Sequence, residues 1–254
     1  MLTTQDISLT PMILHKKDTK RETESGNVII WILLTIALLA ALTFTFTQSS
    51  RTSTTMLTEE IADSMARHLL SFSNDVKQAV RRLRLRGCDE TEISFENSIL
   101  GFNYTNPNSP SDNSCHVFDI NGGGLQVPTL PETIFDLTHN NLSATYNVAG
   151  VFYFRGNTLI TDLKTANPEL LFYAPYINRD VCFAINDLLG TAEPDPGNLE
   201  AGSSNPNPFF VGDYTLAAGD NEYGDQNSAL ADVKSTCFIS NDSDYFFYTV
   251  LIPR

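Results

Sequence analysis

The sequence predicts an α+β chain in which a long N-terminal helix packs on a small antiparallel sheet. Three observations favour this fold class: an uncharged apolar run over residues 27–47, an apolar stripe with helical spacing over residues 57–83, and short aromatic or β-branched runs after residue 88. The first two predict a helix with a transmembrane half and an amphipathic half. The expected parts are a leader at 1–26, a transmembrane helix at 27–48, its amphipathic continuation at 49–87 and a strand-rich head at 88–254.

The apolar run over residues 27–47 has the length of a membrane helix. It holds no charged residue, and at about 1.5 Å per residue it crosses a hydrocarbon core of about 30 Å. A secretory signal peptide has a shorter apolar region that begins closer to the N-terminus, so cleavage and release is the less favoured alternative. More basic residues precede the run than follow it, which places the N-terminus in the cytoplasm: Lys16, Lys17, Lys20 and Arg21 stand before it, and Arg51 and Arg67 after it.

The apolar stripe predicts an amphipathic helix, because its residues recur in steps of three or four: Leu57, Ile61, Met65, Leu69, Phe72, Val76, Val80 and Leu83. Four arginines complement the helix dipole at the C-terminal end, and Gly87 suits a left-handed cap: they are Arg81, Arg82, Arg84 and Arg86. A nucleic-acid or lipid patch is the disfavoured interpretation of these arginines, because no aromatic residue is interleaved with them. If both helical segments are continuous, residues 27–86 span about 90 Å.

Short runs with strand composition predict the sheet of the head. They cover residues 93–96, 115–118, 145–154, 158–161 and 245–252. Arg155-Gly156-Asn157 is expected to form a hairpin turn between two of them, and residues 121–124 a glycine loop. Residues 178–189 predict a second helix, and residues 191–226, which are rich in Pro, Gly, Asn and Asp, predict one long surface loop.

The four cysteines all follow the apolar run and are expected to form two disulfides. Their spacing contains no CxxC pair and no Cys/His cluster of the kind that binds zinc. Three pairings are possible, and proximity in the chain favours Cys88 with Cys115 and Cys182 with Cys237. Free buried thiols are the alternative.

The net charge of −14 lies outside the leader, whose acidic and basic residues cancel. Such a surface repels nucleic acid and anionic lipid headgroups, so no nucleic-acid partner is expected. One stretch of the long loop could offer oxygen ligands for weakly bound Ca²⁺: Asp213, Asp220, Asn221, Glu222 and Asp225. Their spacing matches no EF-hand loop, which favours a solvated acidic loop instead.

No catalytic motif accompanies the histidines at positions 15, 68, 116 and 139. The sequence lacks the GxSxG, HExxH, SxxK and Walker patterns, and the glycines at 122–124 are not followed by the helix and Lys-Ser/Thr that bind phosphate. We therefore expect neither an enzyme nor a bound cofactor. An anchored enzyme with a site outside these motifs is a minor alternative.

The order of apolar span, long amphipathic helix and disulfide-bearing head resembles the type IV pilins and the pseudopilins of type II secretion. The resemblance implies that a prepilin peptidase cuts after Gly26, which leaves Asn27 as the first mature residue. The family usually has Glu at the fifth mature position, where this chain has Trp31, and this departure favours a minor subunit. Residues 93–97, 115–124 and 245–251 also resemble uncharacterised alphaproteobacterial single-span membrane proteins.

The resemblance implies a non-enzymatic, membrane-anchored structural subunit of a pilus or of a type II secretion pseudopilus. Its expected partners are the lipid bilayer and other pilin-like subunits. Its expected place is the bacterial inner membrane, with a cytoplasmic N-terminus and a periplasmic or extracellular head. Ala37, Ala40 and Ala41 offer only a weak small-residue face for helix packing, so a monomeric, signal-anchored periplasmic binding or envelope-organising ectodomain is the alternative.

Overall fold

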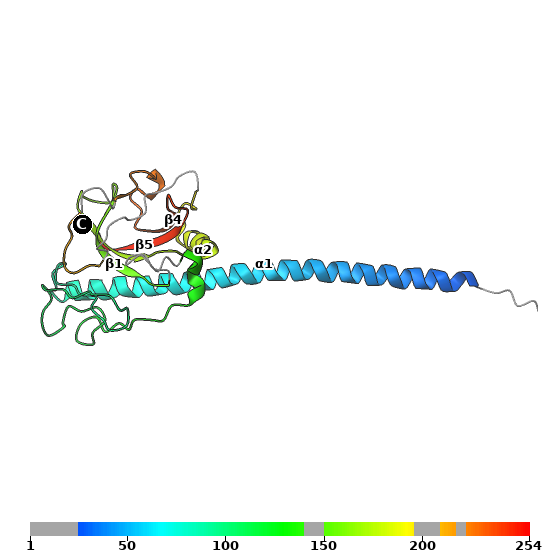
Figure 1. Cartoon of the computed structure of the whole chain (residues 1–254), viewed down its shortest axis with the longest axis horizontal. Coiled ribbons are helices and arrows are strands. Elements are labelled where there is room, and N and C mark those ends of the chain that lie inside the picture. The colour runs from blue at the N-terminus through cyan, green and yellow to red at the C-terminus, as the bar shows by residue number, and fades with distance from the viewer. Residues whose placement is uncertain (1–24, 140–149, 196–208, 217–221) are drawn as a thin grey trace, which may run out of the picture. The chain divides into compact units, whose positions relative to one another are not determined.

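The structure is a computed structural model that describes residues 25–139, 150–195, 209–216 and 222–254, and within the first helix the side chains of residues 30–39 and 59–85. It divides into two compact units, Met1–Ser53 and Thr54–Arg254. Helix α1 (Ser25–Leu85) contributes to both units, and every other helix and strand belongs to the second. Figure 1 shows the helices and strands along the chain.

The described side chains of the first unit form an apolar surface around the helix. Between residues 30 and 39 the large side chains are each at least half exposed: Ile30, Trp31, Ile32, Leu33, Leu34, Ile36, Leu38 and Leu39. Because consecutive residues of a helix point in different directions, this surface has no polar side of its own. No helix in the residues that the structure describes combines the length and apolar character needed to cross a membrane.

In the second unit, one face of α1 supplies part of the core. The buried residues are Ala62, Ala66, Leu69, Phe72, Val76, Ala79, Val80 and Leu83. Five of the eight predicted residues are therefore confirmed, since Met65 is only half-buried and the side chain of Leu57 lies outside the described residues. Ile61 is 53% exposed, and Ala62 is buried in its place. The helix geometry explains the difference, because at 100° per residue Ala62 lies about 20° from Leu69 around the axis and Ile61 about 80°.

The end of α1 has the predicted glycine cap. Gly87 has a φ of +105°, and its N–H donates to the carbonyl oxygen of Arg84 at 3.1 Å. The Cys88 N–H donates to the carbonyl oxygen of Leu83 at 3.2 Å, so the last turn is closed in the Schellman manner. The chain then turns into the loops of the head.

The head contains a mixed five-stranded sheet. Its strands are β1 (Tyr153–Ile160), β2 (Glu169–Ala174), β3 (Glu222–Tyr223), β4 (Ser235–Ile239) and β5 (Tyr245–Ile252), in the order β3-β1-β2-β5-β4. The short strand β3 runs parallel to β1, and the other pairs are antiparallel. A long connection that includes α2 (Arg179–Leu189) separates β2 from β3, and such a connection lets a strand enter the sheet in parallel.

These findings correct the predicted fold class, in which a helix with a transmembrane half packs on an antiparallel sheet. The sheet is mixed rather than antiparallel, and no described helix has the character of a membrane span. Two of the expected strands are also wrong. Residues 93–96 and 115–118 contribute only a single bridge, between Ser94 and His116, because the segment between them is occupied by tight turns.

The predicted hairpin turn at Arg155-Gly156-Asn157 is wrong, since all three residues lie within β1. The pairing of β1 with β2 shifts between Arg155 and Thr158, which marks a β-bulge. A Cβ added at Gly156 would lie 2.6 Å from the carbonyl oxygen of Asp213, so glycine is needed here for close approach of the backbone rather than for a turn.

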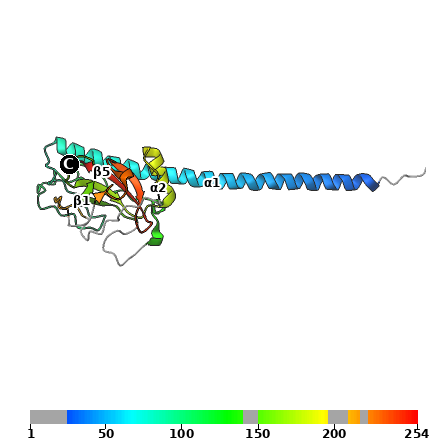
Figure 2. The same ribbon diagram turned by 90° about the horizontal axis from the view of Figure 1, so that it is seen from above.

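The two faces of the sheet are covered differently. One face packs with α1 and α2 in the larger core, which includes Phe154, Phe172 and Phe247 (Figures 1 and 2). The other face carries a second buried cluster that is rich in aromatic residues, including Tyr173, Tyr223, Phe238 and Tyr248. The side of α2 that is not buried by the sheet lies beside α1, and the candidate site is formed there.

Candidate functional site

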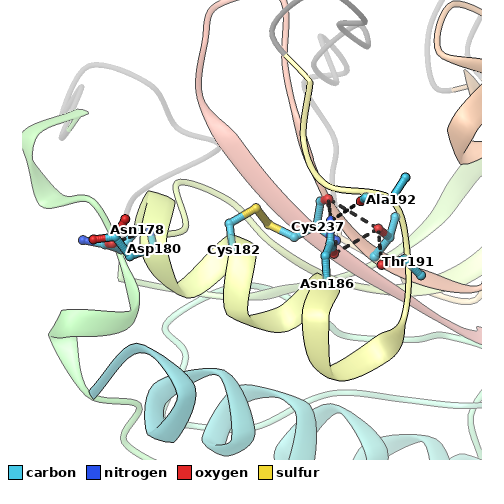
Figure 3. The surroundings of a disulfide bond; sticks show 8 residues. Asn178, Asp180, Cys182, Asn186, Thr191, Ala192 and Cys237 are labelled. Carbon is cyan, nitrogen blue, oxygen red and sulfur yellow. Dashed lines mark hydrogen bonds between the residues drawn. A yellow bond between two sulfur atoms is a disulfide. The ribbon is translucent and has the colours of Figure 1, made fainter. Parts of the chain in front are cut away.

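The two disulfides form the pairs that chain proximity favoured. Cys88–Cys115 joins the end of α1 to a loop of the head, with 5.8 Å between the Cα atoms. Cys182–Cys237 joins α2 to β4, with 5.4 Å between the Cα atoms (Figure 3). The second disulfide therefore fixes α2 on the edge of the sheet, and so fixes one wall of the groove described below.

A buried amide reinforces the attachment of α2 to β4. The Asn186 Nδ2 donates to the carbonyl oxygens of Ala192 and Cys237, each at 2.7 Å. The Asn186 Oδ1 accepts from the Cys237 N–H at 2.7 Å and from the Thr236 hydroxyl at 3.1 Å (Figure 3). Because Asn186, Thr236 and Cys237 are buried, the amide satisfies backbone groups of β4, which is an edge strand of the sheet that the structure describes.

A groove of about 670 Å³ between α1 and α2 is the candidate site. Its apolar lining residues are Ala62, Phe183 and Ala184. We call it the acidic groove because six carboxylates also line it: Glu59, Glu60, Asp63, Asp180, Asp187 and Glu193. Figures 1 and 2 show α2 beside α1 at this place. A groove of this composition suits a partner that presents both apolar and cationic groups.

Most of the negative charge of the acidic groove is not neutralised within the chain. Asp63 pairs with Arg67 at 2.9 Å, and Asp180 pairs with Arg179 at 3.2 Å. Arg179 also lies over the ring of Phe183, with 4.6 Å between its Cζ and the ring centroid. In the part of the chain that the structure describes, the other four carboxylates form no ion pair with Lys or Arg.

Glu59, Glu60 and Asp63 fall within the predicted amphipathic helix at 49–87, but the sequence did not bring them together with α2. The spacing of Asp180 and Asp187 held the missing signal, because residues seven apart share one face of a helix. The direction of that face toward α1 depends on tertiary packing, which spacing alone does not give.

The expected processing site lies at the start of α1. Gly26 and Asn27 fall in the first turn of the helix, which begins at Ser25, and residues 1–24 lie outside the described residues. Cleavage between Gly26 and Asn27 therefore stays a prediction.

The acidic loop that was considered for Ca²⁺ is only partly described, since Asp220 and Asn221 lie outside the described residues. Asp213 accepts from the Thr215 hydroxyl, Glu222 from the Thr161 hydroxyl, and Asp225 from the Gln226 N–H. Among the residues that can be placed, no group of three or more His, Cys, Asp or Glu side chains could hold a metal ion. Calcium binding at this loop stays a prediction.

A small polar hollow surrounds His116. Its volume is about 340 Å³, and its lining includes Glu96, Asn113 and Asp119. The Asn121 N–H and the Asn113 amide donate to Asp119 and lower the pKa of its carboxyl. Asp119 therefore serves the turn that precedes the glycines, and its charge is already engaged by local hydrogen bonds.

A buried carboxyl lies at the bulge of β1. The Glu169 Oε2 accepts from the Ile160 N–H at 2.9 Å, whereas its Oε1 has no hydrogen-bond partner among the described residues. The Oγ1 of its cross-strand neighbour Thr158 and the Oδ1 of Asn157 are likewise buried without a partner in that part of the chain. Burial raises the pKa of Glu169 to about 7.

Comparison with known proteins gives no family for this chain. No family model, no curated protein and no solved structure matches it.

Proposed function

We propose that the chain is a non-enzymatic structural protein, anchored at a membrane by its N-terminal apolar segment, with the Thr54–Arg254 unit displayed outside the cytoplasm. The observation that carries this proposal is the apolar, exposed surface of residues 30–39. A helix with apolar side chains on all sides is stable in lipid or against other apolar helices, and unstable in water.

The chemistry of the head supports an extracytoplasmic location. Both disulfides close loops within one folded unit, and disulfides persist where the compartment is oxidising. The basic residues before the apolar run favour a cytoplasmic N-terminus, which places the head on the opposite side of the membrane.

A subunit of a pilus or pseudopilus is the more specific form of this proposal. It rests on the resemblance in sequence organisation, with Gly26 and Asn27 at the expected cleavage position. The competing form is a permanently anchored, monomeric ectodomain. The two differ in the fate of the leader.

Extraction of the full chain from membranes, followed by N-terminal sequencing, tests both levels of the proposal. Recovery of the chain in the membrane fraction after a carbonate wash is expected, and recovery in the soluble fraction would refute anchoring. A sequence that begins at Asn27 supports the pilus or pseudopilus subunit, whereas an intact leader supports the permanent anchor. Gly26→Ala is the expected blocking substitution, with Glu132→Gln, which changes an exposed side chain, as a control outside the leader.

A further inference from the structure

Three cations group beside the later turns of α1, and the two that belong to the helix lie on the same side of it as the acidic groove. We call Lys77, Arg81 and Lys234 the basic patch. Arg81 follows Asp63 by 18 residues, which is five full turns, so the two side chains share one azimuth about 27 Å apart along the axis. Lys77 lines a shallow hollow with Leu188 and Leu189, at the C-terminal end of the same α2 that walls the acidic groove.

The basic patch holds like charges close together without an anion. None of its three residues forms an ion pair with a carboxylate in the part of the chain that is described. Partial burial lowers the pKa of Lys77, and the neighbouring charges of Lys234 and Arg81 lower it further. Arg81 and Lys234 are exposed, so in a chain with a net charge of −14 the basic patch is a local surface of the opposite sign that an anionic partner can reach.

We propose that the acidic groove of one copy of the chain receives the basic patch of a second copy. The two surfaces have opposite charge, and each combines charged groups with apolar ones: Phe183, Ala62 and Ala184 in the groove, Leu188 and Leu189 beside the patch. The groove carries four carboxylates without an ion pair in the described chain, and the patch carries three such cations. This inference rests on the structural role proposed above, and it names the partner.

The positions of the two surfaces constrain the assembly. Both lie on one side of α1, so two copies whose helices run in the same direction make the contact only when they are offset by about 27 Å along the helix axis. An offset of this kind leaves one groove and one patch free at the ends of a pair. The contact is therefore heterologous, since each copy contributes a different surface to it.

Charge reversal in the full chain tests the contact. The groove variant carries Glu59→Lys, Glu60→Lys and Asp187→Lys, and the patch variant carries Arg81→Glu and Lys234→Glu. Two differently tagged copies are co-expressed, extracted in mild detergent and co-purified through one tag. Each variant alone is expected to lose co-purification by about tenfold or more, because it opposes like charges. Mixing the two variants is expected to restore it, because each then meets an opposite charge.

Matched substitutions outside both surfaces control for net charge and folding. Asp75→Lys lies on α1, Glu132→Lys lies in the short helix Glu132–Ile134, and Arg86→Glu lies beyond the patch; all three sites are exposed. These controls are expected to co-purify like the wild type, and raising NaCl from about 0.05 M to 0.5 M is expected to weaken the wild-type association.

Failure of the mixed variants to associate, when each is folded and membrane-bound, would show that the two surfaces are not partners. An unchanged association of either single variant, or no association of the wild type, would overturn the proposal equally. Binding of a lysine-rich peptide to the groove without any association between copies would assign the groove to a different partner and refute the second copy. In all these outcomes, membrane fractionation and N-terminal sequencing still report separately on anchoring.

Discussion

Replacement of the buried carboxyl of Glu169 by an amide is expected to make the stability of the head less dependent on pH. Glu169→Gln keeps an oxygen that can accept from the Ile160 N–H, the bond that now measures 2.9 Å. It also places an N–H donor beside its cross-strand neighbour Thr158, whose Oγ1 has no partner among the described residues. The substitution therefore removes a titrating group without leaving a cavity.

The sign of the effect follows from the raised pKa. The pKa of Glu169 rises from its ordinary value of 4.5 to about 7 because the side chain is buried. Between these two values the folded chain holds a proton that the unfolded chain releases. The contribution of this group to stability is therefore complete below pH 4.5 and is lost as the pH rises through about 7. At about 1.4 kcal/mol for each pKa unit, the loss is at most about 3.5 kcal/mol.

Urea denaturation of the wild type and of Glu169→Gln at pH 4.5 and pH 8 measures this contribution. The difference in unfolding free energy between the two proteins is expected to move in favour of the variant by about 1 to 3 kcal/mol between these pH values. Glu132→Gln, which changes an exposed carboxyl, is expected to follow the wild type at both pH values. A wild type and a Glu169→Gln variant with parallel pH profiles would refute the reasoning, since burial would then not control this carboxyl.

Three further predictions concern the attachment of α2 and the glycine loop. Asn186→Ala is expected to cost about 3 kcal/mol in urea denaturation, because it removes four buried hydrogen bonds; a cost below about 1 kcal/mol would contradict this account. Joint replacement of Cys182 and Cys237 by Ser is expected to cost about 4 kcal/mol, because the disulfide closes a separation of 55 residues. Reduction should then lower the stability of the wild type by more than that of the variant, which has only the other disulfide to lose; equal losses would contradict this account. Gly123→Ala should destabilise more than Gly124→Ala, since a Cβ at Gly123 meets the carbonyl oxygen of Val117 whereas Gly124 has only its φ of +66° to strain; equal thermal shifts would exclude the contact as the cause.

Local signals in the sequence located several elements well. Residues 178–189 predicted α2, which runs from Arg179 to Leu189, with the Asn178 side chain accepting from the Asp180 N–H at its start. Residues 245–252 predicted β5 completely, because a central strand with both faces buried reads as a continuous apolar run. The cap at Gly87 was predictable because its determinants lie within a few residues of each other in the chain.

Features that depend on distant contacts were not predictable in this way. Strand β4 has the mixed composition Ser-Thr-Cys-Phe-Ile, and its Thr236 hydroxyl is satisfied by Asn186, which is 50 residues away. The segment Arg155-Gly156-Asn157 has the composition of a turn but lies in a strand. Its glycine is needed because Phe210 and Asp213 approach the backbone there. Of the acidic groove, the helix positions of five of the six carboxylates were predictable, but the packing that brings α1 and α2 together was not.

The place of β5 in the sheet imposes an order on folding. β5 follows every other described strand in the chain, yet it lies between β2 and β4. A growing chain that has not yet reached Tyr245 therefore offers β4 no strand to pair with, and the hydrogen-bonding edge of β2 that β5 later fills is open. In that interval the Cys182–Cys237 link can hold β4 on α2, so oxidation would keep β4 in place for the arrival of β5.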